Sequence, residues 1–272
     1  MIDIIKEAQG YEDYDFSWTN FLEYFPEDFF SDEANMPKIR PVISKCLQYM
    51  PEKLRTAELC LEAIKTDDGF FASVLQHVPE KLKTEKICLE AVKKSGKALE
   101  YVPEKLKTAE LCLKAVKQDG SALEHVPENL KTEELCLEAV KQSGNALENV
   151  PEKLKTAKLC REALEQNCCA LQYVPEKLIT AELCLEFVKQ DGGYEAFEFV
   201  PEKLKTKEIC LEAVKQSGSE LENVPEKLRT EEICTEAIKN QSWQRDSLLD
   251  YVPKTLKPKM KKLIKKLEAE EE

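Results

Sequence analysis

A tandem repeat constrains this chain more than any other feature of its 272 residues. The phrase V-P-E-K-L, or a close variant, recurs along the chain, and its successive prolines are separated by 28, 24, 24, 24, 24, 26, 24 and 28 residues. A basic period of 24 residues is typical of arrays in which each copy is one small supersecondary element. The repeated prolines are Pro51, Pro79, Pro103, Pro127, Pro151, Pro175, Pro201, Pro225 and Pro253.

Each repeat predicts two short helices, as the copy at residues 103–126 shows. Thr108 is a natural N-cap for the first helix, and Gly120 occupies the position where a left-handed C-terminal cap is expected. Pro127 interrupts the second helical segment, which predicts a kink or a division into two short turns. The first helix has a broad apolar stripe, formed by Leu111, Cys112, Leu113, Ala115 and Val116.

A helix pair of this length cannot bury its own apolar stripe, so neighbouring copies must supply the missing surface. We therefore predict an all-α fold, an α/α solenoid of about nine to ten two-helix repeats of 24–28 residues with atypical end caps. Residues 1–50 are expected to form an acidic, aromatic-rich N-terminal cap with one degenerate repeat. Residues 51–252 hold eight tandem repeats, and residues 253–272 form a Lys-rich capping helix and an acidic tail.

Three copies are longer than 24 residues, and the extra residues fall between the two helices of the copy. These insertions lie at Thr66–Ala72, Asp191–Glu195 and Asn240–Asp246. Insertions confined to one loop of the repeat should emerge along one edge of the stack.

The segment A-L-E-Y-V-P-E-K-L-K-T-A-E-L-C-L-K-A-V-K-Q-D-G at residues 98–120 resembles a family of short helical repeats catalogued as a domain of unknown function. Those repeats share an A-L-x-[YF]-A…E-L opening and an A-V-K-Q-N-G close. This chain departs from them at Pro127, where the family more often has a small residue, and at Cys112, where it more often has valine. The resemblance implies an α-helical array and no known catalytic residues.

The composition bounds the class of protein. The formal net charge is −12, the opposite of a generic polyanion binder, so the charge argues against direct nucleic-acid binding. No apolar run approaches the roughly 20 residues of a bilayer helix, and the N-terminus does not resemble a secretory signal. Eleven cysteines without such a signal favour a reducing, cytoplasmic location.

Most cysteines recur at one repeat position, within the stripe of the first helix. One thiol per repeat does not provide the convergent ligands that zinc needs, so we expect these side chains to be packed as small hydrophobes. Cys168 and Cys169 instead occupy a loop position, where exposure and a minor redox or metal role stay open. The recurring thiols are Cys60, Cys88, Cys112, Cys136, Cys160, Cys184, Cys210 and Cys234.

One repeat position varies while the rest of the repeat is nearly constant. It lies two residues before the repeated proline, and we call its members the ladder: Tyr49, His77, Tyr101, His125, Asn149, Tyr173, Phe199, Asn223 and Tyr251. Planar amphipathic side chains favour recognition, although they could equally cover the seam between copies. In the acidic N-terminal region, Trp18, Tyr24 and Phe25 are further candidate anchors for a partner, and a structural cap is the competing interpretation.

A second periodic set is formed by lysines on the first helix, most of which follow a glutamate by three residues. This spacing favours solvated ion pairs over a phosphate-binding ridge. The set comprises Lys65, Lys93, Lys117, Lys141, Lys189, Lys215 and Lys239 and is broken by Glu165.

The sequence contains no phosphate-binding glycine loop, helical metal motif or nucleophile elbow, so no catalytic residue, cofactor or metal is expected. The leading hypothesis is a non-enzymatic scaffold that binds a protein or peptide along one face of the solenoid. The alternative is an acidic nucleic-acid mimic that inhibits a basic protein.

Overall fold

The computed structural model describes Phe29 and residues 35–40, 42–67, 74–190, 192–241 and 243–271. The chain divides into two compact units, Met1–Gln142 and Ser143–Glu272, and each unit is considered by itself. The described residues form helices and turns and no strand.

The described part of the first compact unit includes two short α-helices, followed by regular copies of the repeat. Its elements are α3 (Met36–Ile39), α4 (Ile43–Cys46), η3 (Leu47–Tyr49), η4 (Glu52–Leu54), α5 (Ala57–Thr66), η5 (Val74–His77), η6 (Glu80–Leu82), α6 (Glu85–Lys94), η7 (Gly96–Tyr101), η8 (Glu104–Leu106), α7 (Ala109–Gln118), η9 (Gly120–His125), η10 (Glu128–Leu130) and α8 (Glu133–Gln142). The η elements are 3₁₀-helices.

The second compact unit continues the same order of elements and ends in a longer helix. Its elements are η11 (Gly144–Asn149), η12 (Glu152–Leu154), α9 (Ala157–Gln166), η13 (Cys168–Tyr173), η14 (Glu176–Leu178), α10 (Ala181–Val188), η15 (Gly193–Phe199), η16 (Glu202–Leu204), α11 (Lys207–Gln216), η17 (Gly218–Asn223), η18 (Glu226–Leu228), α12 (Glu231–Lys239), η19 (Arg245–Asp250) and α13 (Lys257–Glu271).

The all-α solenoid prediction is confirmed, and the second helix of each pair is a 3₁₀-helix. In the copy that precedes residues 103–126, η7 ends before Val102, whose backbone is extended with φ −77° and ψ 128°. A residue before proline disfavours the α region, so Pro103 limits η7 to six residues. A separate 3₁₀ turn, η8, then follows Pro103, which is the division into two short segments that the repeated proline predicts.

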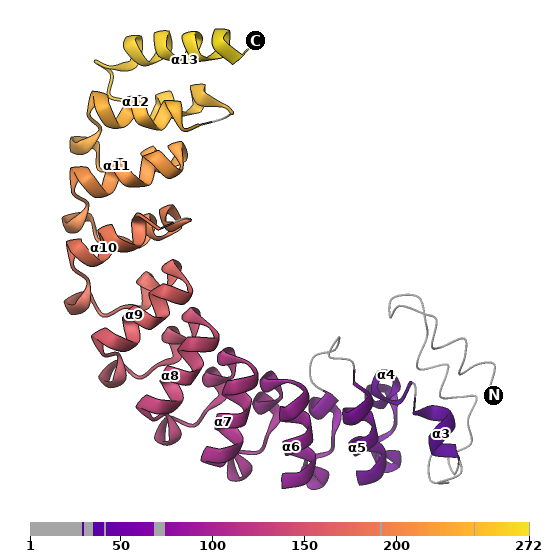
Figure 1. Ribbon diagram of the computed structural model, residues 1–272. Helices are drawn as coiled ribbons and strands as arrows, with labels where there is room; N and C mark the ends of the chain where they lie inside the picture. Colours follow the sequence, from indigo (N-terminus) through magenta and orange to yellow (C-terminus); the bar gives the residue numbers. More distant parts are fainter. Residues whose placement is uncertain are drawn as a thin grey trace. The chain divides into compact units, whose positions relative to one another are not determined.

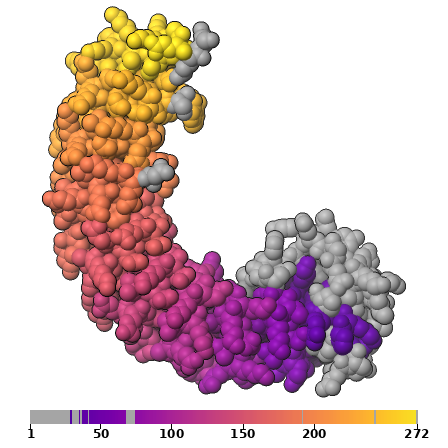
Figure 2. All heavy atoms as spheres, viewed as in Figure 1, coloured from indigo at the N-terminus to yellow at the C-terminus, as the bar shows by residue number. Residues whose placement is uncertain are grey.

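Within each compact unit, the α-helices pack in sequence order and form one layer, and the 3₁₀-helix that follows each α-helix contributes to a second layer against it (Figure 1). Helices α5 to α8 pack in succession in the first unit, as do α10 to α13 in the second. In Figure 2 the colours change steadily along each unit because each repeat adjoins the repeats next to it in sequence.

The predicted threonine caps are present. Thr108 Oγ1 accepts a hydrogen bond from the Leu111 N–H at 3.2 Å, and the threonines before α5, α6 and α8–α12 do the same. Each cap satisfies one of the unpaired N–H groups of the first helical turn.

The expectation of a left-handed cap at Gly120 is wrong. Among the described glycines, only Gly192 has a positive φ, 74°. The repeated glycine is needed for close approach instead: a Cβ on Gly96 would lie 2.4 Å from the carbonyl oxygen of Ala115 in the next repeat. The same distance separates a Cβ on Gly144 from the Ala163 carbonyl oxygen.

The core of each unit lies between the two layers. It contains the recurring cysteines, which are at most 2% exposed, together with the leucine, alanine and valine of each stripe. Burial raises the pKa of the Cys112 thiol to about 11, so this group stays neutral at physiological pH. Cys46, at a different repeat position, is also buried.

A longer helix, α13, ends the second compact unit. At the C-terminal end, α13 packs against α12 and η19, and it buries Met260 and Ile264. Most of the predicted N-terminal cap lies outside the described residues. In the described part, no helix combines the length and apolar character required to cross a bilayer.

Candidate functional site

The ladder side chains lie at the ends of the 3₁₀-helices in the second layer. Tyr49 is 43% exposed, and the other eight members are half-buried. Half-burial leaves part of each planar side chain available to a partner while the rest covers the junction between repeats. The candidates Trp18, Tyr24 and Phe25 lie outside the described residues.

The main chain of the ladder is held by a row of buried cations. Lys107 follows η8, and its side chain is only 7% exposed. Its Nζ donates to the His125 carbonyl oxygen at 3.0 Å and pairs with Glu104 Oε1 at 2.7 Å. Lys107, near the start of its repeat, therefore bonds the backbone of the ladder residue near the end of the same repeat.

The same link recurs in other copies, and we call these cations the staple. Lys155 donates to the Tyr173 carbonyl oxygen at 3.0 Å, and Lys205 donates to that of Asn223 at 2.9 Å. Lys83 and Lys131 pair with the glutamate three residues earlier, as Lys107 does. The staple comprises Arg55, Lys83, Lys107, Lys131, Lys155, Lys205 and Arg229.

The two arginines of the staple make more bonds than the lysines. Arg229 donates to the carbonyl oxygens of Val224 and Glu222 in the preceding copy and to that of Tyr251 near the end of its own copy, at 2.8, 3.0 and 3.0 Å. The planar guanidinium group has enough donors to do this, whereas an ammonium group concentrates its charge at one point. The guanidinium carbon also lies 5.6 Å from the centre of the Tyr251 ring.

One copy lacks the staple. Ile179 occupies the equivalent position before α10, and its side chain has no hydrogen-bond donor. The backbone of the next ladder residue, Phe199, therefore receives no bond from this position.

An exposed acidic side chain stands directly before most ladder residues. We call this set the acidic row: Glu100, Glu124, Glu148, Glu198, Glu222 and Asp250. Its carboxylates accept hydrogen bonds from ladder hydroxyls, since Glu148 bonds Tyr173 and Glu222 bonds Tyr251. The bond to Glu222 raises the pKa of Tyr251 above its usual range. Within each compact unit, the ladder and the acidic row thus form an aromatic and anionic strip.

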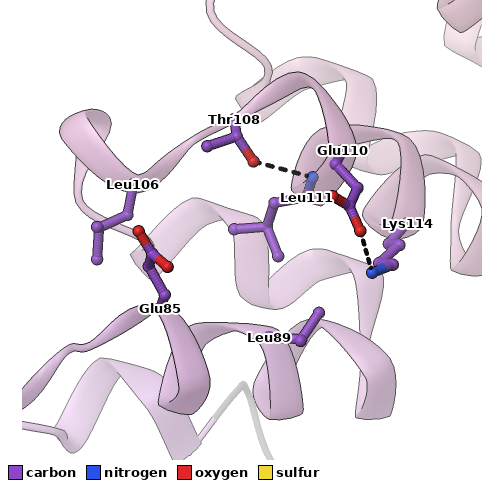
Figure 3. A pocket seen from close by; sticks show the side chains of 7 residues that line it. All are labelled: Glu85, Leu89, Leu106, Thr108, Glu110, Leu111 and Lys114. Carbon is purple, nitrogen blue, oxygen red and sulfur yellow. Dashed lines mark hydrogen bonds and ion pairs between the residues drawn. The ribbon is translucent and has the colours of Figure 1, made fainter.

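The α layer offers a different surface, a shallow cavity of about 230 Å³ between α6 and α7 (Figure 3). Leu89, Leu106 and Leu111 form its apolar part, and Glu110 Oε1 pairs with Lys114 Nζ at 2.6 Å on its rim. The Thr108 hydroxyl is occupied by the helix cap. This cavity brings no nucleophile and base together.

The lysine set on the first helix forms ion pairs, in part as predicted. Lys93 pairs with Glu90 at 2.7 Å and Lys215 with Glu212 at 2.8 Å, both three residues apart. In other copies the pairing runs between repeats, as between Lys189 and Glu208 at 3.1 Å. Such exposed pairs contribute about 0–1 kcal/mol each to stability.

The two loop cysteines are half-exposed, as their position predicts. Cys169 Sγ lies 3.5 Å from Glu195 Oε2, and burial is the first cause that raises the pKa of this thiol to about 11. Over the part of the chain that the structure describes, no three metal-ligating side chains come close enough to hold an ion.

Four consecutive stretches of the chain, residues 58–107, 109–155, 158–205 and 206–257, match the family described as Domain of unknown function (DUF4116). The chain belongs to the DUF4116 family. Each match contains two of the repeated prolines, so one DUF4116 domain corresponds to two structural repeats. The first three matches end at or beside a staple position, Lys107, Lys155 and Lys205.

Neither comparison with individual proteins adds a relative. No curated protein matches the chain significantly. No solved structure matches it significantly.

The staple is the feature of the DUF4116 repeats that the sequence analysis missed. A lysine is ordinarily expected at the surface, so its residue type alone does not distinguish Lys107 from the other charged residues of its turn. The signal was the recurrence of a lysine or arginine four residues after the repeated proline in seven of the eight copies that begin at Pro51 to Pro225. A second missed contact is Gln118, which accepts from the Gly96 N–H at 2.7 Å and donates to the Lys94 carbonyl at 3.3 Å.

Proposed function

We propose that this DUF4116 protein is a non-enzymatic scaffold that binds a protein or peptide along the strip formed by the ladder and the acidic row. The supporting observation is that the main chain and the side chain of a ladder residue have different roles. Five members of the staple, Arg55, Lys107, Lys155, Lys205 and Arg229, donate to the main-chain carbonyl of the next ladder residue, as Lys107 does to His125 at 3.0 Å. This bond does not depend on which side chain the ladder residue carries. The copies keep the staple and vary the side chain.

The charge of the strip favours a basic partner. Glu100, Glu124 and Glu148 are exposed beside half-buried ladder residues, so carboxylates alternate with aromatic, imidazole and amide groups. Such a surface steers a positively charged segment toward planar side chains that can hold it. A cytoplasmic location is part of this proposal because all eleven cysteines are unpaired thiols.

The test compares two surfaces of the same protein. One variant carries Tyr101→Ala, His125→Ala and Tyr173→Ala on the ladder, and the control carries Leu89→Ala, Leu113→Ala and Leu137→Ala on the α layer. Partners are captured on the immobilised full chain from extracts of the source cell, identified by mass spectrometry and remeasured as purified proteins by calorimetry.

We expect the ladder variant to lose at least about tenfold in affinity, the scale of one recognition hot spot, with a melting temperature close to that of the wild type. The α-layer control should bind normally. Equal affinity of the ladder variant and the wild type refutes the proposal, as does loss of binding in the α-layer control alone.

A second candidate function is imitation of nucleic acid, in which the acidic row competes for a basic nucleic-acid-binding protein. The regular spacing of the exposed carboxylates in successive copies favours it. This function requires an affinity that falls steeply as salt rises, because counterions screen exposed charges. An unchanged affinity between 0.1 and about 0.5 M salt would exclude it.

A further inference from the structure

One acidic side chain breaks the repeat at a core position. Five copies have alanine at this place in the 3₁₀-helix, and none of these alanines is more than 2% exposed: Ala98, Ala122, Ala146, Ala170 and Ala196. The next copy has Glu220 instead. Its side chain is half-buried, and burial is the first cause that raises the pKa of its carboxyl group. A carboxylate here carries a desolvation cost that alanine avoids.

The neighbouring copy departs from the repeat as well. In the copy at residues 103–126 one residue, Ser121, separates Gly120 from the recurring alanine, Ala122. In η15 two residues, Tyr194 and Glu195, separate Gly193 from Ala196, so the insertion adds an aromatic ring and a carboxylate. In the copy before that, Cys169 occupies the place of Ser121.

These departures come from three different copies and meet in one cavity of the second compact unit. An open depression of about 330 Å³ is lined by Cys169, Tyr194, Glu195, Glu198, Phe199, Glu220 and Asn223. Phe199 and Asn223 are ladder residues, and Glu198 belongs to the acidic row. The volume is at the lower end of the roughly 300–1,000 Å³ that ligand sites occupy.

The polar contacts inside the cavity leave it strongly anionic. Glu220 Oε2 accepts from Asn223 Nδ2 at 3.0 Å, and Glu195 Oε2 is 3.5 Å from Cys169 Sγ. Neither contact brings a positive charge to the carboxylates.

One cation lies close by, and it is engaged elsewhere. Lys205 Nζ donates to the Asn223 carbonyl oxygen at 2.9 Å and lies 4.5 Å from the centre of the Phe197 ring. The cavity lining therefore carries three carboxylates, and the ammonium group of Lys205 is the staple cation beside it.

We propose that this cavity binds the cationic side chain of an arginine or lysine in the partner peptide, an inference that rests on the proposed scaffold function. A guanidinium or ammonium group would offset the charges of Glu195, Glu198 and Glu220. The rings of Tyr194 and Phe199 would contact the aliphatic stem or the face of the cation. The cavity would then fix the register of a basic peptide on the strip.

The binding probe is a blocked pentapeptide with a central arginine between glycines and serines, and its matched control has citrulline instead. Citrulline has nearly the same shape as arginine and no charge. Each peptide is titrated into the isotopically labelled full chain to about 10 mM, because a single side chain is expected to bind in the millimolar range. Amide shifts are followed by NMR.

We expect saturable shifts at the amides of Tyr194, Glu195, Glu220 and Asn223 with the arginine peptide only. Glu220→Ala restores the residue of the other copies, so the variant should fold, and it should weaken binding at least about tenfold. The control variant Glu133→Ala removes the same charge from the exposed first turn of α8, outside the ladder and the acidic row, and should bind as the wild type does.

Three outcomes would overturn the inference: no saturable shifts, equal shifts with citrulline, or undiminished binding by Glu220→Ala. The scaffold proposal is tested separately by the ladder variant, whose substitutions at Tyr101, His125 and Tyr173 lie outside the cavity lining. If the arginine peptide binds in the cavity and the ladder variant still binds partners normally, the cavity inference stands and the scaffold proposal is refuted.

Discussion

Replacement of Lys107 by methionine tests whether the staple stabilises the stack. Methionine keeps most of the buried aliphatic stem and removes the ammonium group that bonds the His125 carbonyl at 3.0 Å. A hydrogen bond to a charged group is worth about 1.5–3 kcal/mol. The lost pair with Glu104 adds little because that carboxylate is 74% exposed.

Removal of the buried ammonium group also relieves its desolvation cost, so the net effect is smaller than the sum of the lost bonds. We expect Lys107→Met to lower the free energy of unfolding by about 2 kcal/mol. In a urea titration followed by circular dichroism, this loss lowers the midpoint by about 1 M for a slope near 2 kcal/mol per M. Amide hydrogen exchange should show the largest loss of protection around Val126.

The control is Lys105→Met, which removes an exposed lysine from the same turn. The reverse change, Ile179→Lys, introduces the missing staple and should increase protection around Val200. If Lys107→Met and Lys105→Met unfold at the same urea concentration, the staple does not stabilise the stack, and the separation of roles on the ladder loses its physical basis.

The remaining predictions concern the core and the cavity. Gly96→Ala should destabilise the protein by about 3 kcal/mol, measured by urea unfolding, because its Cβ would lie 2.4 Å from a backbone oxygen that cannot move cheaply. A thiol reagent should label Cys168 in the native protein and leave Cys112 unmodified until unfolding, since Cys112 is fully buried and its pKa is raised to about 11. Glu220→Ala should raise the melting temperature at pH 7. Because burial raises the folded-state pKa of Glu220, the native carboxyl binds its proton more tightly than the unfolded one, so wild-type stability increases as pH falls through that raised pKa. The gain from the alanine should therefore shrink in acid, and a gain that grows toward low pH would contradict this assignment.

Much of the fold could be predicted from the period of the repeat. The threonine caps, the buried cysteines and the break at each repeated proline follow from local rules that hold within one copy. Thr108 needs only its own helix to act as a cap, and Cys112 needs only its position on an apolar stripe. Such features are visible in any single repeat.

The features that could not be predicted depend on contacts between copies or between distant residues of one copy. The role of Gly96 is set by the Ala115 carbonyl of the next repeat, and the role of Lys107 is set by the carbonyl of His125, the last residue of η9. The cavity around Glu220 combines residues from three copies. In the sequence, the only sign of this cavity is the substitution of glutamate for a recurring alanine. That Glu220 and Tyr194 line the same cavity is seen only in the structure.

The attachment of the ladder by its carbonyl groups has a consequence for how such a protein can change. A carbonyl oxygen is common to all twenty amino acids, so a mutation at a ladder residue leaves the staple donor that bonds this carbonyl satisfied. The position can therefore accept new side chains without loss of the array, and duplicated copies can diverge toward new binding preferences one residue at a time.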